Sequence, residues 1–418
     1  MTPSPRILMV AYHFPPIQGS SGVHRSISFA RCLAEQGWSP TVLSVTRNAL
    51  FNWSAENERM VPDGVRVIRA LAFDTMRHLT VKEKYPGFLA IPDRWVSWVV
   101  AGVAAGLAHI LRHRPAVIFS TYPIASAHLI AYLLHRISGT PWIADFRDPM
   151  AQDGYPPDPR VWRAFRGIEE RVFAHAARVL FTAPGALDYY CDIFGEGLRE
   201  RSVVIQNGYD EALFRHALDG IEPDTIRREG PLRLVHAGIL YPGERDPRQF
   251  FAAIRDLMDE GIVRRGEVEI SLRGSGHDAH YLPLLKELGL GDVVRFEPAV
   301  GYAQALLEMQ RADGLLLFQA ADCNFQIPAK VYEYFRTRRP IIAFTDPQGD
   351  TAQLLRQAGV GWVADLQDRA EIAATLRDAL GAIRRDRDAR YLDESFVAAC
   401  AREQRAREFV RVVEEVAR

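Results

Sequence analysis

The sequence predicts an α/β protein of two Rossmann-like domains, whose parallel sheets face each other across a cleft. Short β-branched runs alternate with helical patterns, and this alternation stops at a polar stretch, residues 219–230, and then begins again. Strands separated by helices are typical of parallel sheets that are covered on both faces. In addition, 418 residues are too many for one ordinary domain.

The first series of elements begins with a strand at residues 6–11 and breaks off near residues 203–209. A loop rich in Pro, Gly and Ser follows the first strand, and an amphipathic helix carrying Ile27, Phe29 and Leu33 then ends at Gly37. The other strands predicted in this half are Thr41–Val45, Val65–Ile68, Ala116–Ser120, Trp142–Asp145 and Val179–Thr182.

An apolar stretch, Trp95–Leu111, is rich in small residues and helical in character. A membrane-spanning helix needs about 20 apolar residues. This stretch is shorter and contains His109, so we expect a buried amphipathic helix.

The second series resumes after the polar stretch, with helices expected at Gln249–Glu260 and Ala303–Arg311 and one or two charged helices over Glu394–Arg418. Its predicted strands are Leu232–Ala237, Val268–Arg273, Val293–Pro298, Gly314–Phe318 and Pro340–Phe344. We therefore expect an amino-terminal domain over residues 1–215, a carboxy-terminal domain over 228–395 and a terminal helix over 396–418. In open parallel sheets the ligand lies outside the carboxyl ends of the strands, which points to the cleft.

The composition narrows the function classes. Fifty-one basic and 52 acidic residues give a net charge of -1, which argues against a general nucleic-acid binder. With 48% hydrophobic and 25% charged residues, the chain resembles soluble globular proteins. The four cysteines are far apart and form no Cys/His ligand cluster, and His277 and His280 have no third ligand nearby, so we expect free thiols and no metal. The amino terminus lacks a signal-peptide pattern, which predicts a cytoplasmic protein.

Two motifs of the first half carry candidate site residues. The loop of residues 15–25 contains Gly19 and Gly22 and precedes a helix, where small residues let the backbone approach an anion; a plain turn is the alternative. The second motif, residues 142–149, ends a strand with Asp145, Arg147 and Asp148, where chemistry is common in α/β sheets. An internal Asp–Arg pair that fixes a loop would explain the second motif equally simply.

Two further motifs lie in the second half. Residues 234–247 form a strand that runs into a Gly loop with Arg245. In residues 325–335, Lys330 and Glu333 are three apart and therefore lie on one helix face, just after Pro328. A lysine at the positive end of a helix is unfavourable unless an anion binds there, and the carboxylate is placed to accept hydrogen bonds from ribose hydroxyls. The alternative is a surface Lys–Glu pair.

Together these motifs, at their spacing over residues 6–363, resemble family 4 glycosyltransferases, which are retaining enzymes with the glycosyltransferase-B fold. The strings DFRDP (145–149) and PAKVYEY (328–334) are similar to a bacterial branch linked to surface-polysaccharide assembly. One departure concerns the family's Glu-x7-Glu helix: Glu333 matches its second Glu, but Phe325 stands where the first Glu is expected. This departure bears on the sugar contact.

The resemblance implies a role for each candidate residue. A nucleotide diphosphate sugar would be the donor, and no separate cofactor is expected. The catalytic residues implied are Arg245 and Lys330, at the diphosphate, and Asp145. Donor-binding residues would be Gly19, Gly22, Gly238, Arg245, Gly274, Phe296, Lys330 and Glu333. The acceptor side would include Arg25, Arg147, Asp148 and His128, although His128 fits a core-edge position as well. The resemblance also implies that the terminal helix crosses back to the first domain.

The function predicted is the transfer of a sugar, of the hexosyltransferase type, to a hydroxyl acceptor with retention, in polysaccharide, glycolipid or glycoconjugate biosynthesis. Residues 76–95 mix basic and bulky apolar side chains, which suits either peripheral contact with the inner membrane face and a lipid-linked saccharide acceptor, or an ordinary surface loop. Two alternatives remain: a non-catalytic partner subunit, motivated by the missing first Glu, and a nucleotide-sugar epimerase or hydrolase on the same fold.

Overall fold

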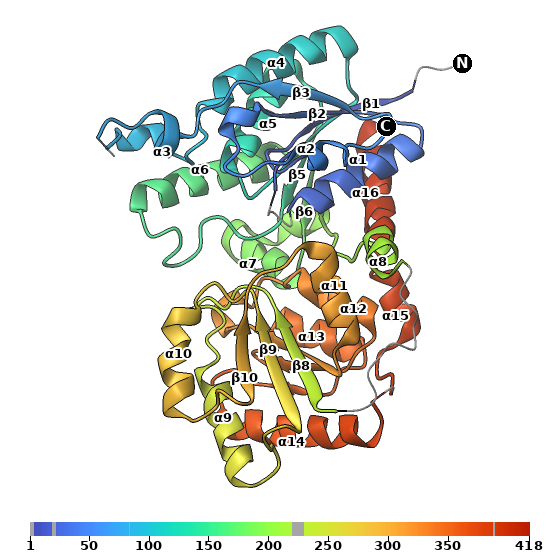
Figure 1. The fold of residues 1–418 in the computed structure, drawn as a ribbon. Helices are drawn as coiled ribbons and strands as arrows, with labels where there is room; N and C mark the ends of the chain where they lie inside the picture. Colours follow the sequence, from blue (N-terminus) through green and yellow to red (C-terminus); the bar gives the residue numbers. More distant parts are fainter. Residues whose placement is uncertain (1–3, 19–21, 83, 220–229, 388) are drawn as a thin grey trace. The chain divides into compact units, whose positions relative to one another are not determined.

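The computed structural model describes residues 4–18, 22–82, 84–219, 230–387 and 389–418. The chain divides into two compact units (Figure 1). Unit 1 comprises residues 1–206 and 402–418, and unit 2 comprises residues 207–401. Each unit is built around its own sheet.

The sheet of unit 1 has seven parallel strands in the described part of the chain, in the order β3-β2-β1-β4-β5-β6-β7. Its strands are β1 (Arg6–Val10), β2 (Ser39–Val45), β3 (Arg66–Ala70), β4 (Val117–Thr121), β5 (Trp142–Phe146), β6 (Arg178–Phe181) and β7 (Ser202–Val204). Its helices are α1 (Gly22–Glu35), α2 (Ala55–Glu58), α3 (Thr75–His78), α4 (Trp98–His113), α5 (Ala125–Ser138), α6 (Pro159–His175), α7 (Pro184–Phe194) and α16 (Arg402–Ala417).

The sheet of unit 2 has six parallel strands among the described residues, in the order β10-β9-β8-β11-β12-β13. Its strands are β8 (Leu232–Ala237), β9 (Val268–Arg273), β10 (Val294–Glu297), β11 (Gly314–Phe318), β12 (Ile341–Phe344) and β13 (Val363–Ala364). Its helices are α8 (Glu211–Leu218), α9 (Arg248–Asp259), α10 (Asp278–Glu287), α11 (Tyr302–Arg311), α12 (Lys330–Thr337), α13 (Asp350–Gln357), α14 (Arg369–Arg385) and α15 (Glu394–Ala399).

Both sheets reverse their strand order beside their first strand. The reversal lies between β1 and β4 in unit 1 and between β8 and β11 in unit 2. Such switch points are where open α/β sheets bind ligands, outside the carboxyl ends of the strands. The prediction of two Rossmann-like domains with parallel sheets is therefore confirmed.

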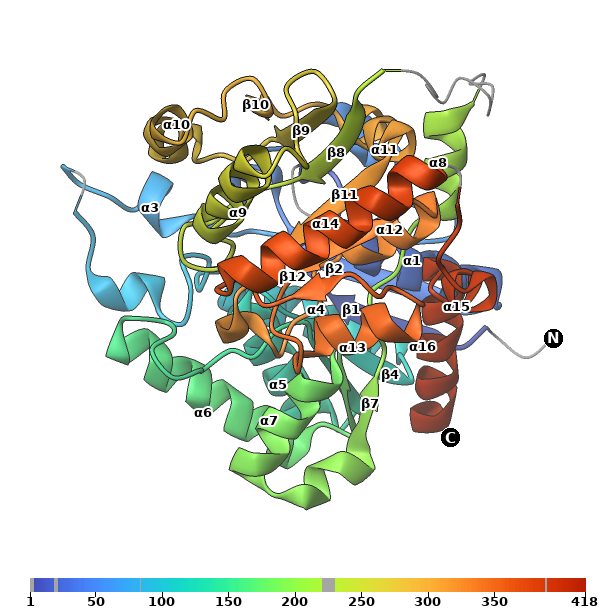
Figure 2. The same ribbon diagram turned by 90° about the horizontal axis from the view of Figure 1, so that it is seen from below.

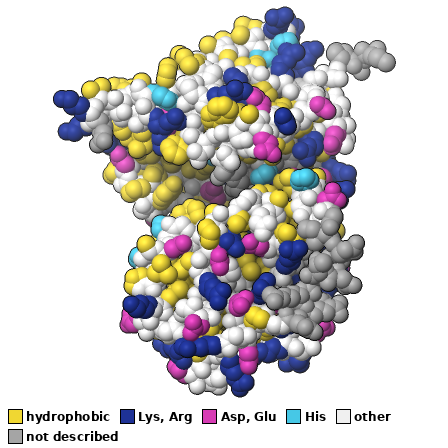
Figure 3. Space-filling view, in the orientation of Figure 1, with side chains coloured by type: hydrophobic (Ala, Val, Ile, Leu, Met, Phe, Trp, Pro, Cys, Tyr) yellow, Lys and Arg dark blue, Asp and Glu magenta, His cyan; other side chains and the backbone are white. Residues whose placement is uncertain are grey.

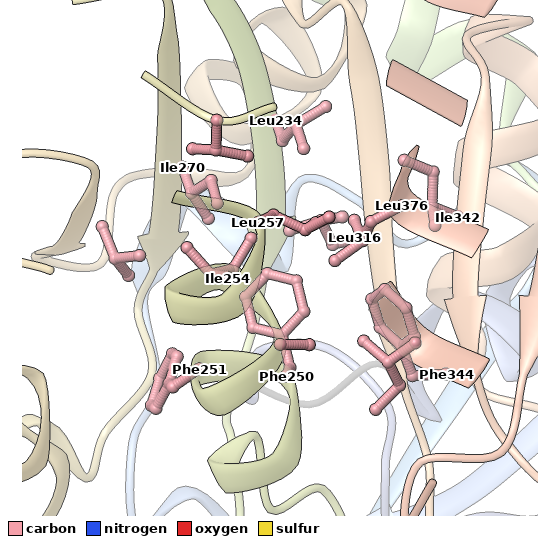
Figure 4. Packing of buried hydrophobic residues seen from close by; sticks show 14 of the residues in the cluster. Leu234, Phe250, Phe251, Ile254, Leu257, Ile270, Leu316, Ile342, Phe344 and Leu376 are labelled. Atoms are coloured by element: carbon pink, nitrogen blue, oxygen red, sulfur yellow. The ribbon is translucent and has the colours of Figure 1, made fainter. Parts of the chain in front are cut away.

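The core of unit 2 shows why these elements form. Helix α9 places Phe250, Ile254 and Leu257 on one face, at the spacing of successive helical turns, and all three are fully buried. They pack with Leu316 of β11, Phe344 of β12 and other members of one cluster (Figure 4). Burying each such side chain contributes about 1.5–3 kcal/mol. Helix α14 runs beside α9 in both ribbon views (Figures 1 and 2).

The apolar stretch Trp95–Leu111 forms most of α4, which packs on α5. A Cβ at Gly102 would lie 2.8 Å from Ile130, and one at Gly106 would lie 2.6 Å from Leu134, so these glycines allow close helix contact. In the described chain, we find no helix with the length and apolarity needed to cross a membrane.

The terminal helix α16 belongs to unit 1. It packs on α1, with the ring of Phe409 stacked on that of Phe29 at 4.2 Å and lying 4.9 Å from that of Phe119. Two edge strands, β7 and β13, were not predicted, because three and two residues are too short to show an alternating pattern.

Candidate active site

The candidate site in unit 2 is centred on Lys330, the first residue of α12. Its Nζ lies 3.3 Å from Nε2 of His236, which is fully buried near the end of β8. Nδ1 of His236 lies 2.9 Å from the carbonyl oxygen of Leu316. Because a carbonyl only accepts, Nδ1 carries the hydrogen, and Nε2 presents its lone pair to Lys330. The switch point between β8 and β11 thus holds the tip of the lysine.

The surroundings of Lys330 disfavour its charge. Burial first, and then the nearby guanidinium of Arg245, lower the pKa of Lys330, and Glu333 opposes them, so that the pKa lies at about 7. Burial also holds the pKa of His236 well below its ordinary value, with Lys330 as the next cause. A neutral imidazole therefore lies beside a lysine that holds its proton weakly. A bound anion would stabilise the charged form of this lysine.

Gly238 makes room for this lysine. The residue has a φ of 125°, and a Cβ there would lie 2.6 Å from Nζ of Lys330. Arg245 follows in the same loop and donates from Nη1 to the carbonyl oxygen of Ile239 at 3.2 Å. Its guanidinium lies 5.5 Å from the centre of the Tyr241 ring. The strand, the glycine and the arginine of this motif therefore lie around Lys330.

Glu333 lies one helical turn after Lys330, as the spacing predicted. The hydroxyl of Tyr302, at the start of α11, donates to Oε1 of Glu333 at 2.5 Å. Gly274, which follows β9, has a φ of 66° and donates its N–H to the carbonyl oxygen of Glu297. Phe296 of β10 stacks on Tyr281 at 6.3 Å, so its ring is partly occupied by the core of unit 2.

In unit 1, Arg25 and Asp145 form a buried ion pair. Nε and Nη2 of Arg25 donate to the two carboxylate oxygens of Asp145 at 3.1 and 2.8 Å, and both side chains are at most 6% exposed. Asp145 also accepts a hydrogen bond from Thr121, and Arg25 donates to the carbonyl oxygens of Ile205 and Gln206. This pair connects α1, β4, β5 and the two residues that follow β7.

Arg147 presents an unsatisfied donor near the amino end of α1. Its Nη1 and Nδ1 of His13 are buried without a hydrogen-bond partner in the described part of the protein. Both atoms border the position that a Cβ of Gly22 would take, His13 at 2.9 Å. Burial, and after it the charge of Arg147, lower the pKa of His13 to about 3. Asp148 is the next residue and is partly exposed, whereas Gly19 lies outside the described residues.

His128 is fully buried, in α5. Its Nδ1 lies 2.8 Å from Oγ of Ser120, which also accepts a hydrogen bond from Nε1 of Trp142. Burial lowers the pKa of His128 to about 4. Its ring lies 4.9 Å from that of Phe146 of β5.

Three residues of these sites were not predicted: His13, His236 and Tyr302. The sequence contains a feature that could have indicated His236, since this histidine interrupts the apolar strand Leu232–Ala237 shortly before a glycine. No sequence feature of this kind marks His13 or Tyr302, because their contacts depend on elements far away in the sequence. Among the described residues, no group of three or more metal-ligating side chains comes together.

Comparison with known proteins identifies a family domain in the first part of the chain. Residues 22–208 match the family model of the glycosyl transferase 4-like domain. The chain carries a family 4 glycosyltransferase domain, and it is a glycosyltransferase. The family recognition is confirmed, whereas the resemblance to the surface-polysaccharide branch stays a prediction. A search of curated proteins found no match.

Solved structures agree on the fold. Sucrose-phosphate synthase from Thermosynechococcus elongatus superposes with a TM-score of 0.66 at 15% identity, covering 99% of both chains. Anabaena HepE in complex with UDP-glucose has a TM-score of 0.64 at 12% identity, covering 98% of this chain and 99% of its own. Trehalose 6-phosphate synthase from Burkholderia multivorans has 0.62 at 12% identity, covering 99% and 97%. The chain therefore has the glycosyltransferase-B fold.

Proposed function

We propose that this glycosyltransferase transfers a sugar from a nucleotide diphosphate sugar to a hydroxyl acceptor with retention. The observation that carries the proposal is the environment of Lys330. Its ammonium group lies over Gly238, beside the neutral His236 and near Arg245, and burial lowers its pKa. Two cations close together raise the free energy of the folded protein unless an anion that neutralises their charge lies between them. A diphosphate is such an anion.

In the proposed mechanism, cleavage of the sugar–phosphate bond leaves negative charge on the diphosphate. Lys330 and Arg245 would stabilise that charge, and they are held in place before the reaction by His236 and by the Ile239 carbonyl. His236 stays neutral, so it positions the lysine without competing for the anion. No metal is needed in this scheme, because the two cations supply the counter-charge.

Glu333 is proposed to bind the ribose of the donor. A carboxylate offers about four lone-pair sites on two oxygens, so the bond from Tyr302 leaves capacity for the two ribose hydroxyls. Gly274 and Phe296, at the ends of β9 and β10, are proposed to border the nucleotide. Titles of solved structures of Anabaena HepE name UDP-glucose and UDP as bound molecules, which supports a nucleotide-sugar donor.

Unit 1 is proposed to hold the acceptor. Arg147 supports this role best, because its buried Nη1 has a hydrogen to donate and lies beside Gly22 at the carboxyl end of β1 and β5. The buried Arg25–Asp145 pair would act indirectly, by fixing the position of α1 against β4 and β5. We place the reaction in polysaccharide, glycolipid or glycoconjugate biosynthesis on the strength of the sequence resemblance.

The donor site is tested with Arg245→Ala and a matched control, Arg248→Ala, an exposed arginine three residues further on. Arg245→Ala should lower the rate of sugar transfer about 10²–10³-fold, by analogy with the loss of an oxyanion-hole donor. Thermal-shift titration with UDP-, GDP- and ADP-sugars selects the donor, and turnover is then measured with it. Equal rates for the two variants would place the diphosphate elsewhere.

The same assay separates the rival functions. A nucleotide-sugar epimerase or hydrolase would convert the donor with no acceptor present, and a non-catalytic subunit would bind donor without any turnover. One solved structure with this fold is a UDP-GlcNAc 2-epimerase, at 10% identity and a TM-score of 0.58. Proton NMR of the product decides retention, since it reports the anomeric configuration directly.

A further inference from the structure

One stretch of unit 1 exposes an unusual number of large hydrophobic side chains. Seven of the 16 such side chains found exposed among the described residues fall within positions 51–88. Five of them, with three cations, define a basic–apolar surface: Phe51, Phe73, Met76, Val81 and Phe88, with Arg77, Lys82 and Lys84. Val81, Phe88 and Phe51 are 77%, 70% and 69% exposed.

The members of this surface are neighbours in space. Arg77 donates to the carbonyl oxygen of Leu50 at 2.8 Å, and its guanidinium lies 5.7 Å from the centre of the Phe51 ring. Asn48 donates to the carbonyl oxygen of Ala72 at 2.8 Å. The loop before Phe51 therefore lies against the segment that contains α3, and this segment projects outward from unit 1 (Figures 1 and 2).

The backbone of the projection is anchored although its apolar side chains are not packed. Buried Asp74 pairs with Arg94, and the N–H of Thr75 donates to the carbonyl oxygen of Arg94 at 2.9 Å. Nε1 of Trp95 donates to the carbonyl oxygen of Ala49 at 3.0 Å. These bonds hold the segment in a defined position, so the exposed side chains are presented on a structured support.

The described charged side chains of this surface are all basic, and in the sequence Glu83 stands between Lys82 and Lys84. Among the described residues from 71 to 92, the exposed ionic side chains are Arg77, Lys82 and Lys84, and the one acid, Asp74, is buried in its ion pair. Glu83 lies outside the described residues. Figure 3 shows basic side chains at the tip of the projection, with hydrophobic ones along it.

The combination of exposed cations and exposed apolar side chains indicates which kind of partner this surface fits. Cations beside bulky apolar side chains match a bilayer interface, where the apolar groups enter the acyl boundary and the cations meet anionic headgroups. A second copy of the chain would bring the same cations together across a symmetric contact, which is unfavourable. We propose that the basic–apolar surface binds the surface of a bilayer containing anionic lipids.

Membrane binding by this surface does not depend on the donor site. Together with the proposed function, it would bring unit 1 to a lipid-linked acceptor, since both the surface and Arg147 belong to that unit. The two proposals can fail separately. A protein that binds vesicles but no nucleotide sugar would remove the proposed function and leave this one standing.

Cosedimentation of the full chain with vesicles tests the proposal, using phosphatidylcholine alone and phosphatidylcholine mixed with phosphatidylglycerol. We expect binding to the mixed vesicles at low salt, weakened by salt. The double variant K82E/K84E should bind about tenfold or more weakly, since each cation near an anionic surface contributes about a threefold to tenfold gain. Phe88→Ser should also weaken binding.

Matched controls are Lys286→Glu on α10 and Leu111→Ser at the end of α4, which remove an exposed lysine and a side chain 72% exposed. All variants should keep the wild-type thermal shift with the donor selected above. Equal binding to both vesicle types, equal loss in the controls, or wild-type binding by K82E/K84E would each overturn the proposal. So would a dimer that Phe88→Ser dissociates, because it would assign the surface to a second copy.

Discussion

Lys330 should make the affinity for the donor depend on pH. Its pKa is about 7 in the free protein, so about half of the molecules carry the charged lysine at pH 7 and about one in a hundred at pH 9. A bound diphosphate favours the charged form and raises this pKa. Affinity is therefore complete below pH 7 and is lost as the pH rises through 7 towards the pKa of the complex. The dissociation constant should rise about 50-fold from pH 7 to pH 9.

Two titratable neighbours of the lysine, His236 and Tyr334, would not imitate this pH dependence. Burial holds the pKa of His236 well below its ordinary value, and burial raises the pKa of Tyr334. A nucleotide sugar is the appropriate probe, because its diphosphate is a diester and keeps the same charge over the range. Isothermal titration in two buffers of different ionisation enthalpy would also count the proton taken up.

The control is Lys330→Arg, whose guanidinium stays protonated throughout. Its dissociation constant should change little from pH 7 to pH 9, even if its absolute affinity is lower because the larger group fits less well over Gly238. A wild-type profile as flat as that of the arginine variant would refute the reasoning, since the lysine would then be charged without a ligand.

Two further predictions concern single carboxylates. Glu333→Gln should bind the donor about tenfold or more weakly, because hydrogen bonds to a charged acceptor contribute about 1.5–3 kcal/mol. A 2′,3′-dideoxy nucleotide should bind the wild type weakly, and the variant should bind it little more weakly still, because both changes remove the same interaction. If the two losses of affinity added instead, Glu333 would be excluded as the ribose ligand. Asp145→Asn should lower the free energy of unfolding by about 3–5 kcal/mol in urea, because it leaves the buried guanidinium of Arg25 without its counter-charge. A stable but inactive variant would instead assign Asp145 to the chemistry.

Local patterns were enough to predict most of the fold. Alternating apolar runs marked the longer strands, and residues three apart on a helix placed Lys330 and Glu333 on one face. The short strands β7 and β13 were missed, because two or three residues at a sheet edge carry no pattern of their own. Their position depends on pairing with β6 and β12.

The sequence by itself determined which residue types stand at the ends of strands and in the first turn of helices, since these depend on near neighbours. Only the tertiary structure decided which of them meet. His236 reaches Lys330 across 94 positions because β8 and β11 are adjacent, and Arg25 reaches Asp145 across 120 because α1 lies over the first sheet. Burial then changed their chemistry, lowering the pKa of the lysine and turning Asp145 into half of an interior ion pair. Periodicity records which face of an element is apolar, but not which distant charge will share its interior, because that depends on the packing of the whole unit.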